Sequence, residues 1–260
     1  MTARGNGLAE KLKPCLLDSR VRYNGRERHS KMSMERSTRQ NQPAIIAVSG
    51  FSSNVGKTTL VCDLLRRLPG WEAIKLTRGH YRSCGRDPKG CCVSDLIREE
   101  PVIRSGREAN YEHGKDTGLF WETGASNVHW VIVTDDQVGQ GISEALSRVT
   151  AEGVIIEGNS LLEFVSADLA IMCARAEGGK IKSSARKALQ KCDMLYLSSL
   201  NENGSVARRQ FEDFHLGLRT DLNIGELPIV TSEDLPWLIS QVNQSDHRTI
   251  AEDAISRMDS

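Results

Sequence analysis

The stretch SGFSSNVGKTTL, residues 49–60, guides the interpretation of the rest of the chain. It follows the apolar run AIIAVS (44–49) and leads into KTTLVCDLLRRL (57–68), whose leucines have the spacing of an amphipathic helix. A strand, a small polar loop and a helix in this order present backbone N–H groups and a helix N-terminus to an anion. The sequence therefore predicts a phosphate-binding loop.

The loop differs from the usual pattern by one residue. That pattern is G-x-x-x-x-G-K-[ST], whereas here five residues separate Gly50 from Gly56 because Phe occupies position 51. In such a loop Lys57 reaches the β and γ phosphates and Thr58 holds Mg²⁺. The expected nucleotide-binding residues are Gly50, Ser52, Ser53, Asn54, Val55, Gly56, Lys57, Thr58 and Thr59.

Short apolar runs alternate with helical patterns along most of the chain. The expected strands are 44–49, 71–76, 130–134, 153–157, 169–173, 194–198 and 227–230, and the expected helices are 57–68, 138–149, 183–191 and 233–242. This alternation predicts an α/β fold, with a mostly parallel sheet of about seven strands and helices on both faces. Such sheets bind ligands beyond the carboxyl ends of their strands. The polar segment 77–127 has no good period and is longer than a routine connection, which often indicates function.

Composition divides the chain into two regions, and its balanced charge argues against two classes of partner. Residues 1–42 are basic and aperiodic, and we interpret them as a disordered extension or an overlong start, with an arm that binds an acidic partner as the alternative. Residues 43–260 fit a single domain. The chain has 34 Lys plus Arg and 34 Asp plus Glu, so neither a nucleic acid nor a membrane partner is expected. Without an apolar span or a signal peptide in the sequence, a cytoplasmic location is expected.

The loop spacing resembles that of dethiobiotin synthetase, a member of the SIMIBI class of P-loop NTPases. That class also contains metallochaperones and the adaptor protein of molybdopterin-guanine dinucleotide biosynthesis. Three further stretches resemble the adaptor, in matching order from about Ala44 to Ala174: IKLTRGH (74–80), KDT (115–117) with GA (124–125), and VIIEGNS (154–160). Dimeric ATPases of the class carry a signature lysine where this chain has Ser52, which argues against that branch.

Departures from the family pattern leave open which nucleotide base the protein binds. The adaptor's phosphate loop has four intervening residues, and its double histidine is represented here by His80 alone. The Asn-Lys-x-Asp motif by which many GTPases read guanine would stand at Leu200-Asn201-Glu202-Asn203, without the Lys or the Asp. Asn201 stays a candidate nucleotide contact, and both GTP and ATP stay possible.

Three residues of the matching stretches are catalytic candidates together with Lys57. Glu157 ends a Val- and Ile-rich strand, where a carboxylate suits Mg²⁺ or orients the attacking group. Asp116 is the candidate for a second Mg²⁺ carboxylate beside Thr58. Lys75 could offset charge on a transferring phosphoryl group. The alternative for all three is a solvated polar residue without a role.

A cysteine-rich segment follows the second expected strand. His80, Cys84, Cys91 and Cys92 could hold Zn²⁺ or an iron-sulfur cluster, although their spacing matches no standard zinc pattern. A redox pair, a covalent trap for a thiol-reactive substrate, or free thiols are the alternatives. Arginines in the same segment, including Arg78, could bind an anionic small molecule or be simply solvated.

Three functions remain open at this point. The first is Mg²⁺-dependent binding and slow hydrolysis of GTP or ATP in cofactor biosynthesis or delivery, with a cofactor-biosynthesis protein as partner, as the resemblance to the adaptor implies. The second is an ATP-dependent small-molecule kinase or ligase of the dethiobiotin synthetase type. The third is a metallochaperone whose cysteine-rich segment holds the cargo. The resemblance also implies a homodimer.

Overall fold

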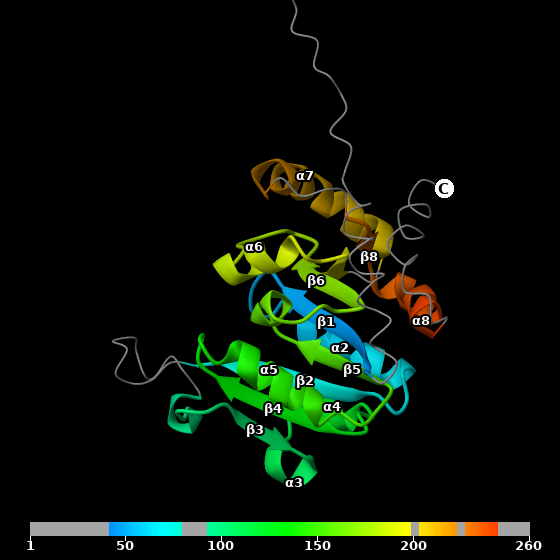
Figure 1. The fold of residues 1–260 in the computed structure, drawn as a ribbon. Helices are drawn as coiled ribbons and strands as arrows, with labels where there is room; N and C mark the ends of the chain where they lie inside the picture. The colour runs from blue at the N-terminus through cyan, green and yellow to red at the C-terminus, as the bar shows by residue number, and fades with distance from the viewer. Residues whose placement is uncertain (1–41, 80–92, 199–202, 223–226, 244–260) are drawn as a thin grey trace, which may run out of the picture. The chain divides into compact units, whose positions relative to one another are not determined.

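A single mixed sheet of eight strands, in the order β3-β4-β2-β5-β1-β6-β7-β8, runs through this chain (Figure 1). The computed structural model describes residues 42–79, 93–198, 203–222 and 227–243. The strands are β1 (Ala44–Gly50), β2 (Glu72–Arg78), β3 (Val102–Ser105), β4 (Val128–Val133), β5 (Gly153–Glu157), β6 (Leu169–Arg175), β7 (Met194–Ser198) and β8 (Ile229–Val230). Every neighbouring pair is parallel except β3 and β4. The predicted α/β fold is confirmed, with β3 as an additional antiparallel edge strand.

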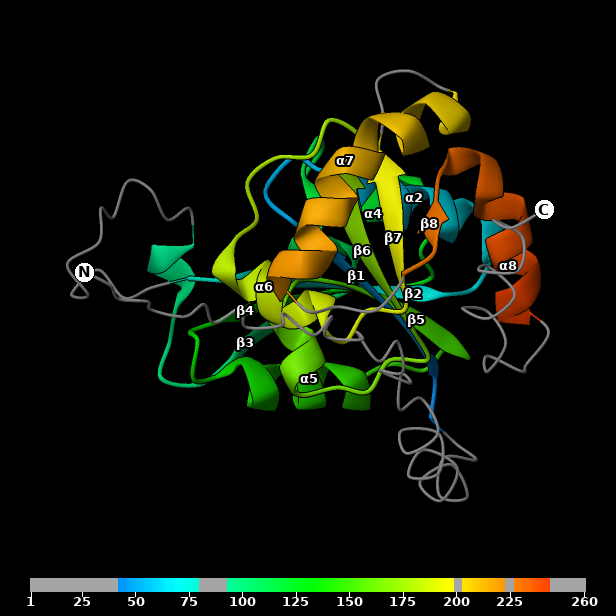
Figure 2. The ribbon, with the colours of Figure 1, turned by 90° about the horizontal axis from the view of Figure 1, so that it is seen from above.

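Helices cover both faces of the sheet, as Figure 2 shows from above. One face carries α2 (Lys57–Arg67), α4 (Asp116–Glu122) and α8 (Leu235–Asn243). The other carries α5 (Val138–Ser147), α6 (Ser183–Leu189) and α7 (Gly204–Leu222). The short α3 (Arg107–Asn110) follows β3, and single 3-10 turns form η4 (Ser94–Leu96), η5 (Ser160–Glu163) and η6 (Ser232–Asp234). Neither α4 nor α7 was among the expected helices.

The two-sided cover explains the unbroken apolar strands. Along β1, Ile45 and Ala47 pack into the core beneath α5, α6 and α7, whereas Ile46 and Val48 pack into the core beneath α2, α4 and α8. A strand with both faces buried has no solvent-facing positions, so its sequence shows no polar alternation. This arrangement places β1 inside the sheet, with β5 and β6 on either side.

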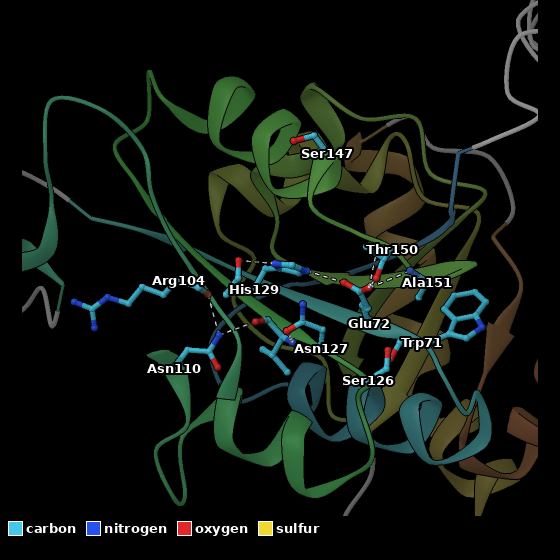
Figure 3. Close-up of polar contacts among 12 residues, drawn as sticks. Trp71, Glu72, Arg104, Asn110, Ser126, Asn127, His129, Ser147, Thr150 and Ala151 are labelled. Carbon is cyan, nitrogen blue, oxygen red and sulfur yellow. Dashed lines mark hydrogen bonds and ion pairs between the residues drawn. The ribbon is translucent and has the colours of Figure 1, made fainter. Parts of the chain in front are cut away.

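A buried polar network lies at the amino-terminal edge of the parallel strands (Figure 3). The carboxylate of Glu72, the first residue of β2, lies 2.7 Å from Nε2 of His129 on β4. The other Glu72 oxygen accepts hydrogen bonds from the N–H and hydroxyl of Thr150 and from the N–H of Ala151. The hydroxyl of Ser105 lies 2.8 Å from Nδ1 of His129. The network therefore joins β2, β3 and β4 to the turn that precedes β5.

All described residues belong to the unit Asn41–Ser260. The interpretation of residues 1–42 stays a prediction, since residues 1–41 lie outside the described part. None of the helices in the described ranges is both long and apolar enough to cross a membrane.

Candidate phosphate-binding site

The loop from Gly50 to Lys57 turns sharply between β1 and α2. Asn54 and Gly56 have φ angles of 59° and 85°, both in the left-handed region. A Cβ atom at Gly50 would lie 2.7 Å from Cγ2 of Val55, and one at Gly56 would lie 2.8 Å from Cβ of Ser198. Both positions therefore need glycine, because the loop and β7 approach them closely.

The carbonyl groups and the N–H groups of this loop differ in their hydrogen bonding. Each carbonyl from Gly50 to Gly56 accepts a hydrogen bond, from Asn159 Nδ2, Lys182 N, Lys57 Nζ, Ser52 Oγ, Arg175, Ser198 Oγ and Leu60 N in that order. By contrast, the N–H groups of residues 52–59 donate to none of the described residues. Unpaired donors grouped at a helix N-terminus form an anion-binding site. The loop therefore has the donor arrangement of a phosphate cradle.

Phe51 accounts for the extra residue of the loop. Its side chain is 1% exposed and packs in the core, with its ring centroid 6.4 Å from that of Phe211 and 6.2 Å from that of Phe214 on α7. Its N–H donates to the carbonyl of Cys173 on β6, continuing the pairing of β1 with β6. The extra residue therefore belongs to the core and continues the pairing of β1 with β6 by one hydrogen bond.

Four polar side chains from different elements meet beside the start of α2. Lys75 of β2 places Nζ 2.6 Å from Oε1 of Glu157 and 2.5 Å from Oδ2 of Asp116. The hydroxyl of Thr58 lies 3.1 Å from the other oxygen of each carboxylate. The sheet brings two of them together, because Lys75 and Glu157 are register partners on β2 and β5. Asp116 comes from the first turn of α4.

This set of ligands fits a hard divalent cation. A hydroxyl and two carboxylates offer only oxygen atoms, which Mg²⁺ prefers. One oxygen of each carboxylate faces Lys75 and the other faces Thr58, so the Thr58 side could accept a cation while Lys75 keeps its contacts. The Glu157 side chain is only 2% exposed, whereas that of Asp116 is 42% exposed and faces the open side.

Charge and burial shift the pKa values of three side chains at the site. Burial lowers the pKa of Lys57 and outweighs the opposing charge of Glu157. Burial alone would lower the pKa of Lys75, but the charges of Glu157 and Asp116 raise it overall. Burial would likewise raise the pKa of Asp116, but the charge of Lys75 and hydrogen bonds from Lys75 and Thr58 lower it. Lys75 and Asp116 therefore form a charged pair at neutral pH.

Four further residues hold the loop from outside and were not predicted. The amide of Asn159 donates to the Gly50 carbonyl and accepts from its N–H, each at 2.9 Å. Arg175 donates twice to the Asn54 carbonyl, and Ser198 donates to that of Val55. Lys182 donates through its ammonium to the Ser53 hydroxyl at 3.0 Å. Asn159, Arg175 and Ser198 stand at or just after the ends of β5, β6 and β7, so the convergence of parallel strands could have identified them.

A cleft of about 1070 Å³ extends from the loop in two directions. Toward β7 and β8 it is lined by Tyr196, Gly204 and Thr231. On the β2 side it passes Lys75 and reaches Thr77 and Arg78. The cleft therefore has room on both sides of the phosphate loop.

The structure brings together most of the residues expected at the site. The loop residues Gly50, Ser52, Ser53, Asn54, Val55, Gly56, Lys57, Thr58 and Thr59 lie together at the carboxyl edge of the sheet with Lys75, Asp116 and Glu157. Arg78 forms an ion pair with Asp135 at 2.9 Å. His80, Cys84, Cys91, Cys92 and Asn201 lie outside the described residues, so their proposed ligand roles stay predictions. Within the described ranges, no three His, Cys, Asp or Glu side chains are grouped to hold a metal.

Comparisons with known proteins give a limited picture. No protein-family model and no curated protein matches the chain. Three similar solved structures are LpxK from Aquifex aeolicus in complex with ATP, a Zn(II)-bound YjiA GTPase variant and an LAO/AO transport system kinase. Their identities are 16%, 14% and 15%, and their TM-scores are 0.39, 0.36 and 0.42. The alignments cover 73%, 73% and 89% of this chain and 70%, 57% and 71% of the other chains. Likeness at this level carries no conclusion about ligand or activity.

Proposed function

We propose that this protein binds a nucleoside triphosphate with Mg²⁺ and hydrolyses it. One observation carries the proposal: N–H groups of residues 52–59, which donate to none of the described residues, lie beside Lys57 and the cluster of Thr58, Asp116 and Glu157. The first feature suits phosphate oxygens and the second suits the cation that accompanies them. Neither feature alone would indicate a nucleotide as strongly as their adjacency does.

Each group of the site has a distinct task in this proposal. The loop N–H groups and Lys57 bind the phosphates, while Thr58, Asp116 and Glu157 would hold Mg²⁺ directly or through water. A bound Mg²⁺ supplies positive charge against the negative charge that develops on the phosphates. Lys75 fixes the orientation of both carboxylates through contacts of 2.5 and 2.6 Å. The cleft toward β7 and β8 would hold the base, and both ATP and GTP are kept as candidates.

The wider role we propose is slow hydrolysis in cofactor biosynthesis or delivery, which the resemblance to the molybdopterin-guanine dinucleotide adaptor supports. A second candidate is phosphoryl transfer to a small anion. The cleft favours it, because the space around Thr77 and Arg78 lies across the loop from Thr231. A nucleotide whose base occupies the β7 side would leave the β2 side for a second substrate.

Titration calorimetry with ATP and with GTP, in Mg²⁺ and then in excess chelator, tests the proposed function. Lys57→Ala should weaken triphosphate binding by at least about 100-fold, because one ammonium makes two charge-assisted contacts. Chelation should weaken binding by the wild-type protein. The matched control is Lys187→Ala, since Lys187 is exposed and its Nζ lies 3.7 Å from Glu163. Equal affinities for wild type and Lys57→Ala would refute the proposal.

The fate of a labelled γ-phosphate separates the two candidate roles. Label released only as inorganic phosphate, at the same rate with or without a small-molecule extract, would support hydrolysis. Label found in a new small molecule, and absent from it with Lys57→Ala, would support phosphoryl transfer instead.

A further inference from the structure

Three cations contact the phosphate loop through uncharged oxygens. Lys57 donates to the Ser52 carbonyl, Lys182 donates to a serine hydroxyl, and Arg175 donates to a backbone carbonyl. Within the described residues none of the three pairs with a carboxylate at salt-bridge distance. Lys75 differs, since it contacts two carboxylates in the same cleft. In the described part of the chain, the loop is therefore contacted by three cations that form no ion pair with a carboxylate.

Lys182 is anchored by its backbone and has an exposed side chain. Its N–H donates to the Phe51 carbonyl at 2.9 Å, which fixes the residue beside the start of the loop. Its Nζ lies 3.0 Å from the hydroxyl of Ser53, whose neighbour Ser52 accepts from Lys57 Nζ at 2.9 Å. Two ammonium groups thus bind adjacent residues of the loop. Burial is the main reason that the pKa of Lys57 is lowered, and the charges of Lys75 and then Lys182 act in the same direction.

We propose that Lys182 exchanges the Ser53 hydroxyl for an oxygen of the terminal phosphate of a bound nucleoside triphosphate. Lys182 would then let the site distinguish a triphosphate from a diphosphate. This inference rests on the proposed function and adds a ligand for one particular phosphate.

Geometry directs Lys182 to the last phosphate. In loops of this kind the backbone cradles the α and β phosphates, and the loop lysine reaches the β and γ phosphates. The position of Lys57 Nζ beside Ser52 therefore marks where the β and γ phosphates would lie. The ammonium of Lys182 contacts the next loop residue, Ser53. A change in the conformation of this side chain would bring the ammonium to the terminal phosphate. A diphosphate would leave it without a phosphate oxygen in reach.

Exchange is favourable for Lys182 and not for Arg175. The bond from the Lys182 ammonium to a phosphate joins two opposite charges, whereas its present bond to the Ser53 hydroxyl joins the ammonium to a neutral oxygen. The Ser53 side chain is exposed and can bind water once Lys182 leaves. Arg175 donates two hydrogen bonds to the Asn54 carbonyl, in a residue with φ of 59°, and so stabilises the turn. Moving it would cost the loop its conformation.

The test measures the affinities of each variant for a triphosphate and its diphosphate, ATP with ADP and GTP with GDP, in Mg²⁺. Lys182→Ala should weaken triphosphate binding by about tenfold or more and change diphosphate binding less than about twofold. Lys182→Arg should restore part of the discrimination, because it keeps the charge. Lys180→Ala removes a lysine from an exposed position two residues earlier and should leave both affinities unchanged.

Each other outcome has a definite meaning. Unchanged triphosphate affinity in Lys182→Ala would overturn the proposal. An equal loss for both nucleotides would also overturn it, since Lys182 would then act only on the shape of the loop. Failure of the wild-type protein to bind any nucleotide would instead defeat the proposed function, as would full binding by Lys57→Ala.

Discussion

Two buried glutamates on neighbouring strands have opposite surroundings. Glu72 begins β2 at the amino edge of the sheet, and Glu157 ends β5 at the carboxyl edge. Both side chains are 2% exposed. Glu72 accepts hydrogen bonds from two backbone N–H groups, a hydroxyl and His129. Among the described residues, the partners of the Glu157 carboxylate are Lys75 and Thr58, two side chains that line the cleft.

Under the proposed function, the same residue type would serve structure in one place and chemistry in the other. Two of the donors to Glu72 are backbone N–H groups, and none of its partners lines the cleft. A ligand in the cleft would therefore not replace the partners of this carboxylate. The partners of Glu157 are groups that a bound nucleotide and Mg²⁺ could share or replace. A buried carboxylate with replaceable partners is the better candidate for function.

The first test of this contrast is Glu157→Gln, for which we expect the largest effect. The substitution keeps the shape of the side chain but removes the charge that faces Lys75 and Thr58. Turnover of Mg²⁺-nucleotide should fall about 100-fold, a typical result of removing one electrostatic group from an active site. Phosphate release measures the rate, and thermal melting should show only a small change. Retained turnover would place Glu157 with Glu72 as a structural residue.

The matched substitution at the other edge, Glu72→Ala, should act on stability alone. It leaves the buried ring of His129 without its acceptor, together with the N–H groups of Thr150 and Ala151, which lie nearer the surface. Losing the carboxylate from this network should lower the free energy of unfolding by about 3 kcal/mol. Urea unfolding measures this loss. Triphosphate affinity below the melting range should equal that of the wild type, and a selective loss of affinity would contradict the contrast.

Sequence patterns predicted several residues that lie together at the carboxyl edge of the sheet, because parallel strands bring their carboxyl ends to the same edge. Glu157 ends β5, whereas Lys75 is the fourth of the seven residues of β2, and the parallel register of the two strands brings them together. Asp116 was placed by the resemblance of the KDT stretch, since nothing in its local pattern leads to the sheet. Lys182 gave no signal, because its approach to Ser53 spans 129 positions of sequence.

Other elements left weak patterns for physical reasons. The edge strand β3 has four residues, all only partly buried, so it lacks an apolar run. The helix α4 contains Gly118, which lowers helix propensity. Glycine is needed there because a Cβ would lie 2.0 Å from the carbonyl oxygen of Glu112. The pairing of His129 with Glu72 joins residues 57 positions apart and has no periodic signature.

The last and smallest predicted effect concerns acid. Burial alone would raise the pKa of Glu72, but the hydrogen bonds from His129, Thr150 and Ala151 lower it. A carboxylate whose pKa is lower in the folded state stabilises the protein above its unfolded pKa, about 4.3. That contribution is lost as the pH falls through the folded pKa. Asp116 has a lowered pKa and acts in the same direction, so wild type alone cannot assign the effect to Glu72.

Glu72→Gln isolates the contribution of the amino edge, because glutamine cannot titrate and Asp116 is left intact. Between pH 7 and pH 3 the urea midpoint should fall further in the wild type than in Glu72→Gln. The difference between the two falls should correspond to about 1 kcal/mol of unfolding free energy. Asp116→Asn is the matched variant at the carboxyl edge. Its side chain is 42% exposed, so solvent screens its ion pair and its acid loss should stay close to that of the wild type. If Asp116→Asn rather than Glu72→Gln removed the acid loss, the carboxyl-edge cluster would hold the fold together, and the division of roles between the two glutamates would be wrong.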